Sequence, residues 1–185
     1  MSAATLPARR AYRLTALAVV VAVGLAVAAG IAAWSIRSYA ATAGGGGTGS
    51  NLTPSSAAGK ELLGAARQAA VTYTSYDYRH LTQDFQDFAK LTTPALRKDY
   101  LRDAGALATQ FRQLQVRAQS SVVTAGIGQV TAASGQPLTA TVLIALDDVV
   151  SNRSAGSHSQ TRYDRLVLSM QQIGGKWLCN GISAA

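Results

Sequence analysis

The hydrophobic and polar positions divide the chain into four stretches. Residues 14–36 carry no charged side chain, and residues 41–56 consist mostly of Gly, Ser, Thr and Ala. Beyond residue 57 the apolar positions first recur every three or four residues, as in helices, and from about residue 116 they alternate, as in strands. We therefore expect a basic tail (1–13), a membrane-spanning helix (14–36), a Gly/Ser-rich linker (37–56) and an α+β domain (57–185).

The apolar segment 14–36 is long enough to cross a lipid bilayer. Its 23 residues would form a helix of about 34 Å, against a hydrocarbon core of about 30 Å. Three arginines precede the segment and one follows it, which predicts a cytoplasmic N-terminus and an extracytoplasmic domain at the cell membrane. The side chains expected at the membrane interface are Arg9, Arg10, Tyr12, Arg13, Trp34 and Arg37.

A cleavable signal peptide is the alternative reading of this segment. Ala41-Thr42-Ala43 matches the small-residue pattern of a cleavage site, but signal peptides carry an apolar region of only about 7–15 residues. The greater length of the segment favours a retained anchor. Both readings place the remainder of the chain outside the cytoplasm.

Small residues recur every fourth position in the apolar segment. Such a stripe lets two membrane helices approach each other closely. Ten of the 23 residues are Ala or Gly, so chance composition is the simpler explanation. The candidate packing stripe consists of Ala18, Ala22, Ala26 and Gly30.

Three helices are expected at the start of the domain. The first follows a cap at Ser55 or Ser56, and the second begins near Leu81. The third begins at Pro94, a residue favoured in the first helical turn, with one of the two preceding threonines as its cap. The apolar faces of these helices contain Leu62, Leu63, Ala66, Ala69, Ala70 and Tyr73, then Leu81, Phe85 and Phe88, and finally Leu101, Ala104, Leu107, Ala108 and Phe111.

The second half of the domain reads as antiparallel strands. Alternation is clearest over residues 138–146. Further strands are expected over 116–130, 162–173 and 176–182, with turns at 133–136, 151–159 and 174–175. Short turns between successive strands imply antiparallel pairing. The predicted fold class is therefore α+β, with about three helices packed on a four-stranded antiparallel sheet.

The net charge of +8 does not indicate nucleic-acid binding. Four arginines flank the apolar segment, and residues 60–185 hold thirteen basic and nine acidic side chains, a net charge of +4. A single cysteine and two histidines make a disulfide framework, a cysteine metal cluster and a zinc hydrolase poor candidates. We expect no cofactor, a buried Cys179, and His80 and His158 at the surface.

Asp147 and Asp148 form the single pair of adjacent carboxylates. Neighbours on a strand point to opposite faces of the sheet, so these two groups cannot act together on one substrate. Asp148 shares a face with apolar side chains. We expect Arg162 or Arg165 to neutralise it across the next hairpin.

Several short motifs follow one another through the domain. They are Tyr76-Asp77-Tyr78-Arg79-His80-Leu81, Asp84-Phe85, Leu91-Thr92, Arg97-Lys98-Asp99-Tyr100 and Gly175-Lys176-Trp177-Leu178. Together with the basic N-terminus and the single span, their order resembles the actinobacterial Mce-associated membrane proteins over about residues 10–183. Ser75 stands where that family commonly has an apolar residue, which is a departure from the pattern.

The resemblance implies a fold and a function. It implies a cone-shaped, nuclear-transport-factor-2-like domain and an accessory role in Mce-type lipid import. The partners would be the lipid bilayer and Mce transporter subunits, with a lipid as a possible ligand and no nucleic acid. The protein would act by protein–protein interaction outside the membrane and would not be an enzyme.

The motif residues are expected to have structural roles. Tyr76 and Tyr78 flank a helix end, where Asp77 accepts hydrogen bonds from nearby backbone amides. Trp177 is expected to anchor the core from the last strand. The complete set of motif residues is Tyr76, Asp77, Tyr78, Leu91, Thr92, Tyr100 and Trp177.

Two other functions remain open at this point. A scaffold of a conjugation or type IV secretion apparatus can have the same span and domain layout. A ketosteroid-isomerase-like enzyme or binding domain would need a carboxylate base and a tyrosine donor inside the cone. Asp77, Tyr76 and Tyr100 are the candidates for those roles, and this is the less favoured alternative.

Overall fold

A computed structural model describes residues 52–153 and 158–185. Within these residues the chain forms three helices and five strands. No helix in the described part is long and apolar enough to span a bilayer. The predicted tail, the membrane-spanning segment and the linker up to residue 51 lie outside the described residues, together with the interface residues and the small-residue stripe assigned to them.

The helices begin where the sequence predicts. Helix α2 (Ala57–Thr74) is capped by Ser56, whose Oγ accepts a hydrogen bond from the Gly59 N–H at 3.0 Å. Helix α3 (Leu81–Lys90) follows a short turn. Helix α4 (Pro94–Leu114) has Thr93 as its cap and Pro94 in its first turn. Leu52, which precedes the capping turn of α2, packs against the main core.

The strands form one antiparallel sheet in chain order, with five strands instead of the expected four. They are β1 (Tyr76–Asp77), β2 (Arg117–Thr131), β3 (Thr139–Ser151), β4 (Gln160–Ile173) and β5 (Lys176–Ala184). The extra strand is β1, which pairs Tyr76 with Ala118 and Asp77 with Arg117. A two-residue strand directly after a helix shows no alternation, and so the sequence pattern does not reveal it.

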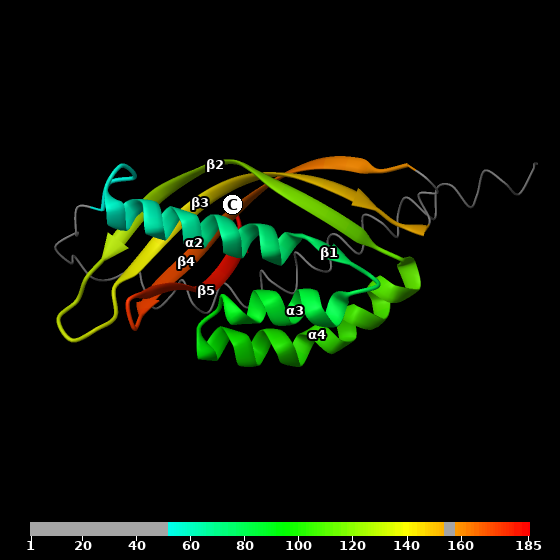
Figure 1. Ribbon diagram of the computed structural model, residues 1–185, viewed down its shortest axis with the longest axis horizontal. Helices are drawn as coiled ribbons and strands as arrows, with labels where there is room; N and C mark the ends of the chain where they lie inside the picture. The colour runs from blue at the N-terminus through cyan, green and yellow to red at the C-terminus, as the bar shows by residue number, and fades with distance from the viewer. Residues whose placement is uncertain (1–51, 154–157) are drawn as a thin grey trace, which may run out of the picture.

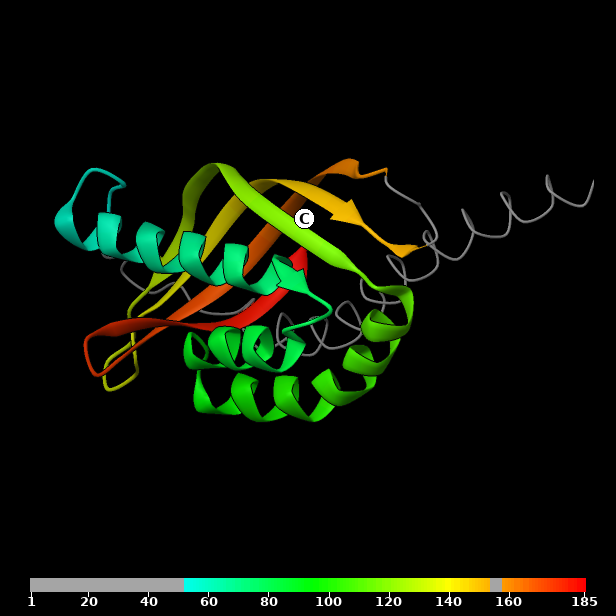
Figure 2. The ribbon, with the colours of Figure 1, turned by 45° about the vertical axis from the view of Figure 1, so that its right-hand side comes forward.

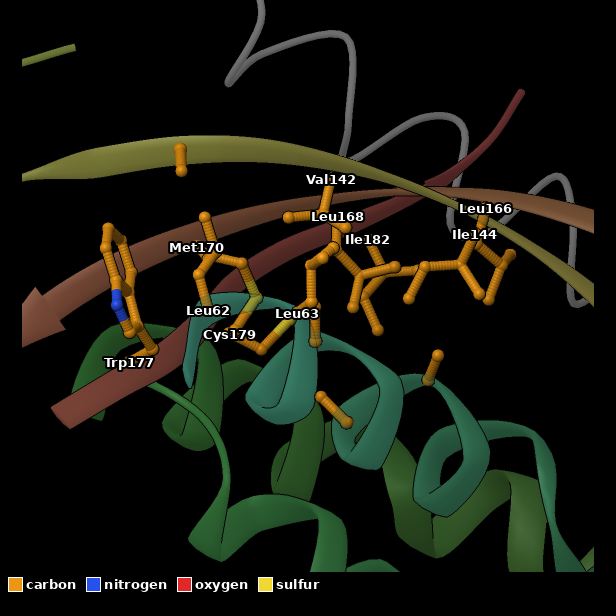
Figure 3. Packing of buried hydrophobic residues seen from close by; sticks show 14 of the residues in the cluster. Leu62, Leu63, Val142, Ile144, Leu166, Leu168, Met170, Trp177, Cys179 and Ile182 are labelled. Carbon is orange, nitrogen blue, oxygen red and sulfur yellow. The ribbon is translucent and has the colours of Figure 1, made fainter. Parts of the chain in front are cut away.

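All three described helices lie on one side of the sheet, which curves over them (Figures 1 and 2). The core fills the space between this inner face and the helices. Leu62 and Leu63 of α2 point toward the inner face, where Leu168 and Ile182 are buried (Figure 3). The inward positions of β3 are Ala140, Val142, Ile144, Leu146 and Asp148, all of them buried.

A second, smaller apolar cluster lies between α3, α4 and the start of β2. It contains Leu81, Phe85, Ala104, Ala108, Phe111 and Val116. Of the residues expected on the inward stripe of α4, Ala104, Ala108 and Phe111 are buried, and Leu107 packs at the edge of the cluster. Leu101, the first residue of that stripe, is half-buried and belongs to neither cluster. The predicted α+β class is therefore confirmed, and its helices pack as the sequence pattern indicates.

Candidate functional site

The opposite face of the sheet, here called the outer sheet face, is not covered by any of the described helices (Figure 2). Large apolar side chains are exposed on it. Leu143 is 49% exposed, Val149 is 44% exposed and Tyr163 is 81% exposed. Val123, at a bulge in β2, is 62% exposed. Several large apolar side chains exposed on one face make that face a candidate site for binding another molecule.

The outer sheet face is also poor in charge. No Lys, Arg, Asp or Glu occurs between Arg117 and Asp147, a range that covers nearly all of β2 and the first two thirds of β3. Cross-strand pairing places Leu143 between Gly126 and Val167. Because few charged groups would lose hydration there, this part of the face can be covered by a partner at low desolvation cost.

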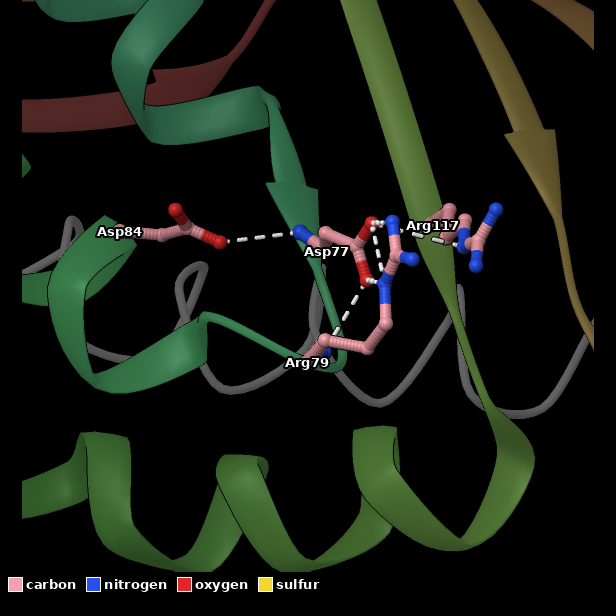
Figure 4. A network of polar contacts seen from close by, with 4 residues as sticks. All are labelled: Asp77, Arg79, Asp84 and Arg117. Carbon is pink, nitrogen blue, oxygen red and sulfur yellow. Dashed lines mark hydrogen bonds and ion pairs between the residues drawn. The ribbon is translucent and has the colours of Figure 1, made fainter.

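The Tyr-Asp-Tyr motif joins α2, β1 and α3. The Asp77 carboxylate accepts hydrogen bonds from the Arg79 side chain at 2.6–3.1 Å and from the Arg79 N–H at 3.0 Å. Arg117 forms an ion pair with it at 3.5 Å. The Asp77 N–H donates to Asp84 Oδ2 at 2.9 Å (Figure 4). The hydrogen bonds from Arg79 hold the pKa of Asp77 well below its usual range.

The two tyrosines of the motif make aromatic contacts on either side of Asp77. The Tyr76 ring stacks on Phe111 with centroids 4.7 Å apart. The Arg117 guanidinium lies over the Tyr78 ring at 5.3 Å, a cation–π contact. Burial raises the pKa of Tyr76. The Arg79 N–H bond to Asp77 is the expected hydrogen bond from a nearby amide, and all three residues make contacts within the domain.

The other motif residues fasten the α3–α4 connection to the last strand. Thr92 is fully buried, and its Oγ1 donates to the Ala89 carbonyl at 2.7 Å. The Cys179 N–H donates to the Leu91 carbonyl, and the Thr93 N–H donates to the Cys179 carbonyl, both at 2.8 Å. These backbone hydrogen bonds hold Leu91-Thr92 against strand β5 at Cys179.

Aromatic rings fill the space between α2, α3 and α4. Tyr100 makes edge-on contacts with Phe85 and Phe88, and Tyr73 packs against Phe88 with centroids 5.0 Å apart. Burial raises the pKa of both Tyr73 and Tyr100. Trp177 is 7% exposed and belongs to the main core, as the sequence predicts.

Asp148 is the unexpected feature of the inner face. Its side chain is 2% exposed, and its Oδ1 has no hydrogen-bond partner among the described residues. Arg162 lies directly opposite in the strand register, but it forms an ion pair with Asp164 at 3.7 Å. Arg165 pairs with Ala145 and so lies on the outer face. The expected neutralising ion pair therefore does not form.

The surroundings of Asp148 raise the pKa of its carboxyl group. Burial, followed by hydrogen bonding to the Asp164 carboxyl, raises the pKa of Asp148 to about 6, while Ser120 and Arg162 act in the opposite direction. Asp147, its neighbour in the chain, points to the outer face, as predicted from the strand period. The two carboxylates do not form a dyad.

The residues considered for enzyme chemistry have other partners in the structure. Asp77, the candidate base, is bound by two arginines, and its pKa is lowered instead of raised. Tyr76 and Tyr100 are packed against phenylalanine rings. Cys179 is buried, and burial raises the pKa of its thiol to about 12. Residues 52–153 and 158–185 contain no group of His, Cys, Asp and Glu that could hold a metal ion.

No protein-family model matches the chain, and no curated protein matches it either. Several solved structures have a similar fold. The periplasmic domain of DotI has a TM-score of 0.59 and 11% identity, covering 76% of this chain and 99% of that one. A periplasmic fragment of TraM has a TM-score of 0.56 and 7% identity, covering 68% and 96%.

A third similar structure is that of CagV from Helicobacter pylori strain 26695, a VirB8 homologue of a type IV secretion system. Its TM-score is 0.52 at 9% identity, covering 68% of this chain and 97% of that one. At these identities the likeness shows a shared fold, and it extends over nearly the whole of each of the three solved chains. The comparisons give no support to the Mce-associated family that the motif order resembles.

Proposed function

We propose that this protein is a non-enzymatic, membrane-anchored scaffold of a conjugation or type IV secretion apparatus. Residues 14–36 would anchor it, and the nuclear-transport-factor-2-like domain would act outside the cytoplasm by binding other proteins of the complex. The observation that carries this proposal is the fold shared with periplasmic parts of DotI and TraM and with CagV, a VirB8 homologue of a type IV secretion system. The accessory role in lipid import, with Mce subunits or a lipid as partners, now ranks behind it.

The outer sheet face supports a scaffold role. It carries the exposed side chains of Leu143, Val149 and Tyr163, is nearly uncharged over β2 and most of β3, and is free of any described helix. Linking the domain to the membrane raises its effective concentration near other membrane proteins, so that weak individual contacts suffice for assembly. The structural contacts of Asp77, Tyr76 and Tyr100 argue against the enzyme alternative.

Leu143→Arg tests whether the outer sheet face binds partners. The substitution puts a charge at the centre of the uncharged area, and a buried unpaired charge at an interface costs enough to abolish a weak contact. We expect the full-length protein, purified in mild detergent, to lose the proteins that co-purify with the unchanged chain. Quantitative mass spectrometry of those proteins is the measurement.

Gln68→Arg is the matched control, because Gln68 is exposed on α2 and the same charge is added on the helix side. It should retain the partners. Co-purification of conjugation or secretion components supports the proposal, and co-purification of Mce and permease subunits supports lipid import. Equal retention of partners by both variants would contradict a role for the outer sheet face.

A further inference from the structure

Strand β2 has a long free edge. It has fifteen residues, but β1 pairs with only Arg117 and Ala118. On that side of β2, the described part of the chain supplies no strand for residues 119–131. The N–H of Ser120 donates to Ser75 Oγ at 3.0 Å. From Ser121 onward the edge offers backbone donors and acceptors to another strand.

This edge lacks two of the usual protections against pairing, charged side chains and prolines. Edge strands of soluble proteins are commonly blunted by charged side chains or prolines. Residues 119–131 contain neither. The strand does contain two irregularities of register, between Val122 and Thr124 and between Ile127 and Val130, and the regular stretch around Gly126 lies between them.

The side chains along the edge follow a symmetric order about Gly126. Val122, Ala125, Ile127 and Val130 are the half-buried residues that pack on the core from the inner face. Gly126 is exposed on the outer face, and an added Cβ there would meet no atom within 4 Å. On β2 the inward-facing residues direct their backbone groups to the free edge, as Ser120 does toward Ser75.

We propose that β2 pairs with β2 of a second copy of this chain, antiparallel, about a two-fold axis at Gly126. This register sets Ala125 opposite Ile127 and Val122 opposite Val130, so inward apolar residues meet inward apolar residues. The two irregularities of register also fall opposite each other. The pairing would join two five-stranded sheets into one, with the helices of both copies on the same side.

A second copy fits this edge better than a charged partner strand. When β2 pairs with β2 of a second copy, no like charges come together, because residues 119–131 are uncharged. A basic or acidic strand would find no opposite charge on β2 to pair with. A two-fold axis uses the same surface on both copies, which is the commonest symmetry of protein dimers. The inference does not depend on which larger assembly the protein joins.

Gly126→Cys tests this register in the full-length chain in membranes. The two-fold axis would place residue 126 of one copy directly opposite residue 126 of the other, as a non-hydrogen-bonded pair. The Cα atoms of such a pair are about 4.5 Å apart, a distance that a disulfide can span. Gly105→Cys is the matched control, because Gly105 is exposed on α4 with equally open space. The buried Cys179, with its raised pKa, stays out of the reaction.

Under mild oxidation we expect Gly126→Cys to give at least about tenfold more disulfide-linked dimer than Gly105→Cys, because pairing holds the two thiols at high effective concentration. Equal yields from the two variants would overturn the proposal. A disulfide from residue 126 to a different protein would also overturn it, since the occupant of the edge would then not be a second copy.

The second measurement is the mass of the purified protein in detergent. Gly126→Lys places two like charges against each other and should halve the mass of the complex, whereas Gly105→Lys should leave it unchanged. A dimer that persists in Gly126→Lys would locate the contact elsewhere, for example at the small-residue stripe Ala18, Ala22, Ala26 and Gly30, and would contradict pairing through β2.

Discussion

Asp148 lies on the inner face of β3 with a buried carboxyl group whose Oδ1 accepts no hydrogen bond from the described residues. A buried ionised carboxylate without a close cation destabilises the folded state. Here the nearest candidate cation, Arg162, forms its ion pair with Asp164. Asp148 is therefore a residue at which the fold favours the protonated form.

The pH dependence of stability follows from this shift. The folded pKa of about 6 lies above the ordinary value of 3.8, so the contribution of Asp148 is most favourable below 3.8 and is lost as the pH rises through 6. We expect Asp148→Asn to raise the free energy of unfolding by roughly 1–3 kcal/mol at pH 8. The gain should disappear near pH 4.

Urea denaturation at the two pH values checks this prediction. Asp147→Asn is the control, because it makes the same change of charge on the outer face of the same strand. We expect it to alter stability little and equally at both pH values. A gain from Asp148→Asn that is the same at pH 4 and pH 8 would show that Asp148 does not titrate in this range.

At the scale of elements, β1 is held in place by polar contacts more than by pairing. It shares only two residue pairs with β2, while Asp77 connects it to Arg79, Arg117 and Asp84. The free edge of β2 begins where this short strand ends. The position of β1 therefore determines how much of the β2 edge is free to pair with another strand.

Asp77→Asn should weaken this junction. The uncharged amide has one acceptor oxygen in place of two and no ion pair with Arg79, so we expect a loss of about 1 kcal/mol in the free energy of unfolding. The pKa of Asp77 is lowered in the fold, so its contribution is present at neutral pH and is lost as the pH falls through the folded value. Chemical denaturation at neutral pH is the measurement.

Asp103→Asn provides the comparison, since Asp103 forms a more exposed ion pair with Arg102 on the surface of α4. It should change stability by a few tenths of a kcal/mol at most. If the two variants lose the same amount, the Asp77 network does not hold β1 in place.

The local signals in the sequence were sufficient for the helices but not for every strand. Ser56 and Thr93-Pro94 mark helix starts because capping acts over three residues of chain. The two residues of β1 depend on pairing with Ala118 and Arg117, which lie about forty residues away, and no local pattern encodes that pairing. The hairpin pattern was enough to predict that Arg162 lies opposite Asp148. It could not predict that Arg162 forms its ion pair with Asp164, because that depends on how the side chains pack.

At the scale of the whole molecule, the helices pack on one face of the sheet and leave the other face, with exposed Leu143, Val149 and Tyr163, uncovered by any described helix. The motif order suggested the Mce-associated proteins, whereas periplasmic parts of DotI and TraM and the VirB8 homologue CagV share the fold at 7–11% identity. At such identities layers and topology persist while motifs do not, because a core tolerates extensive substitution if its pattern and volume are kept. The fold class was therefore accessible from the sequence, and the comparison to structures was needed to rank the functions.

The central claim is that an anchored domain of this fold is displayed outside the cytoplasm. An alkaline phosphatase reporter fused behind Ala185 of the full-length chain tests it most directly, because this enzyme needs the disulfides that form outside the cytoplasm. The account predicts an active fusion that remains in the membrane fraction. A fusion that is inactive, or a mature protein found free in the soluble fraction, would contradict it.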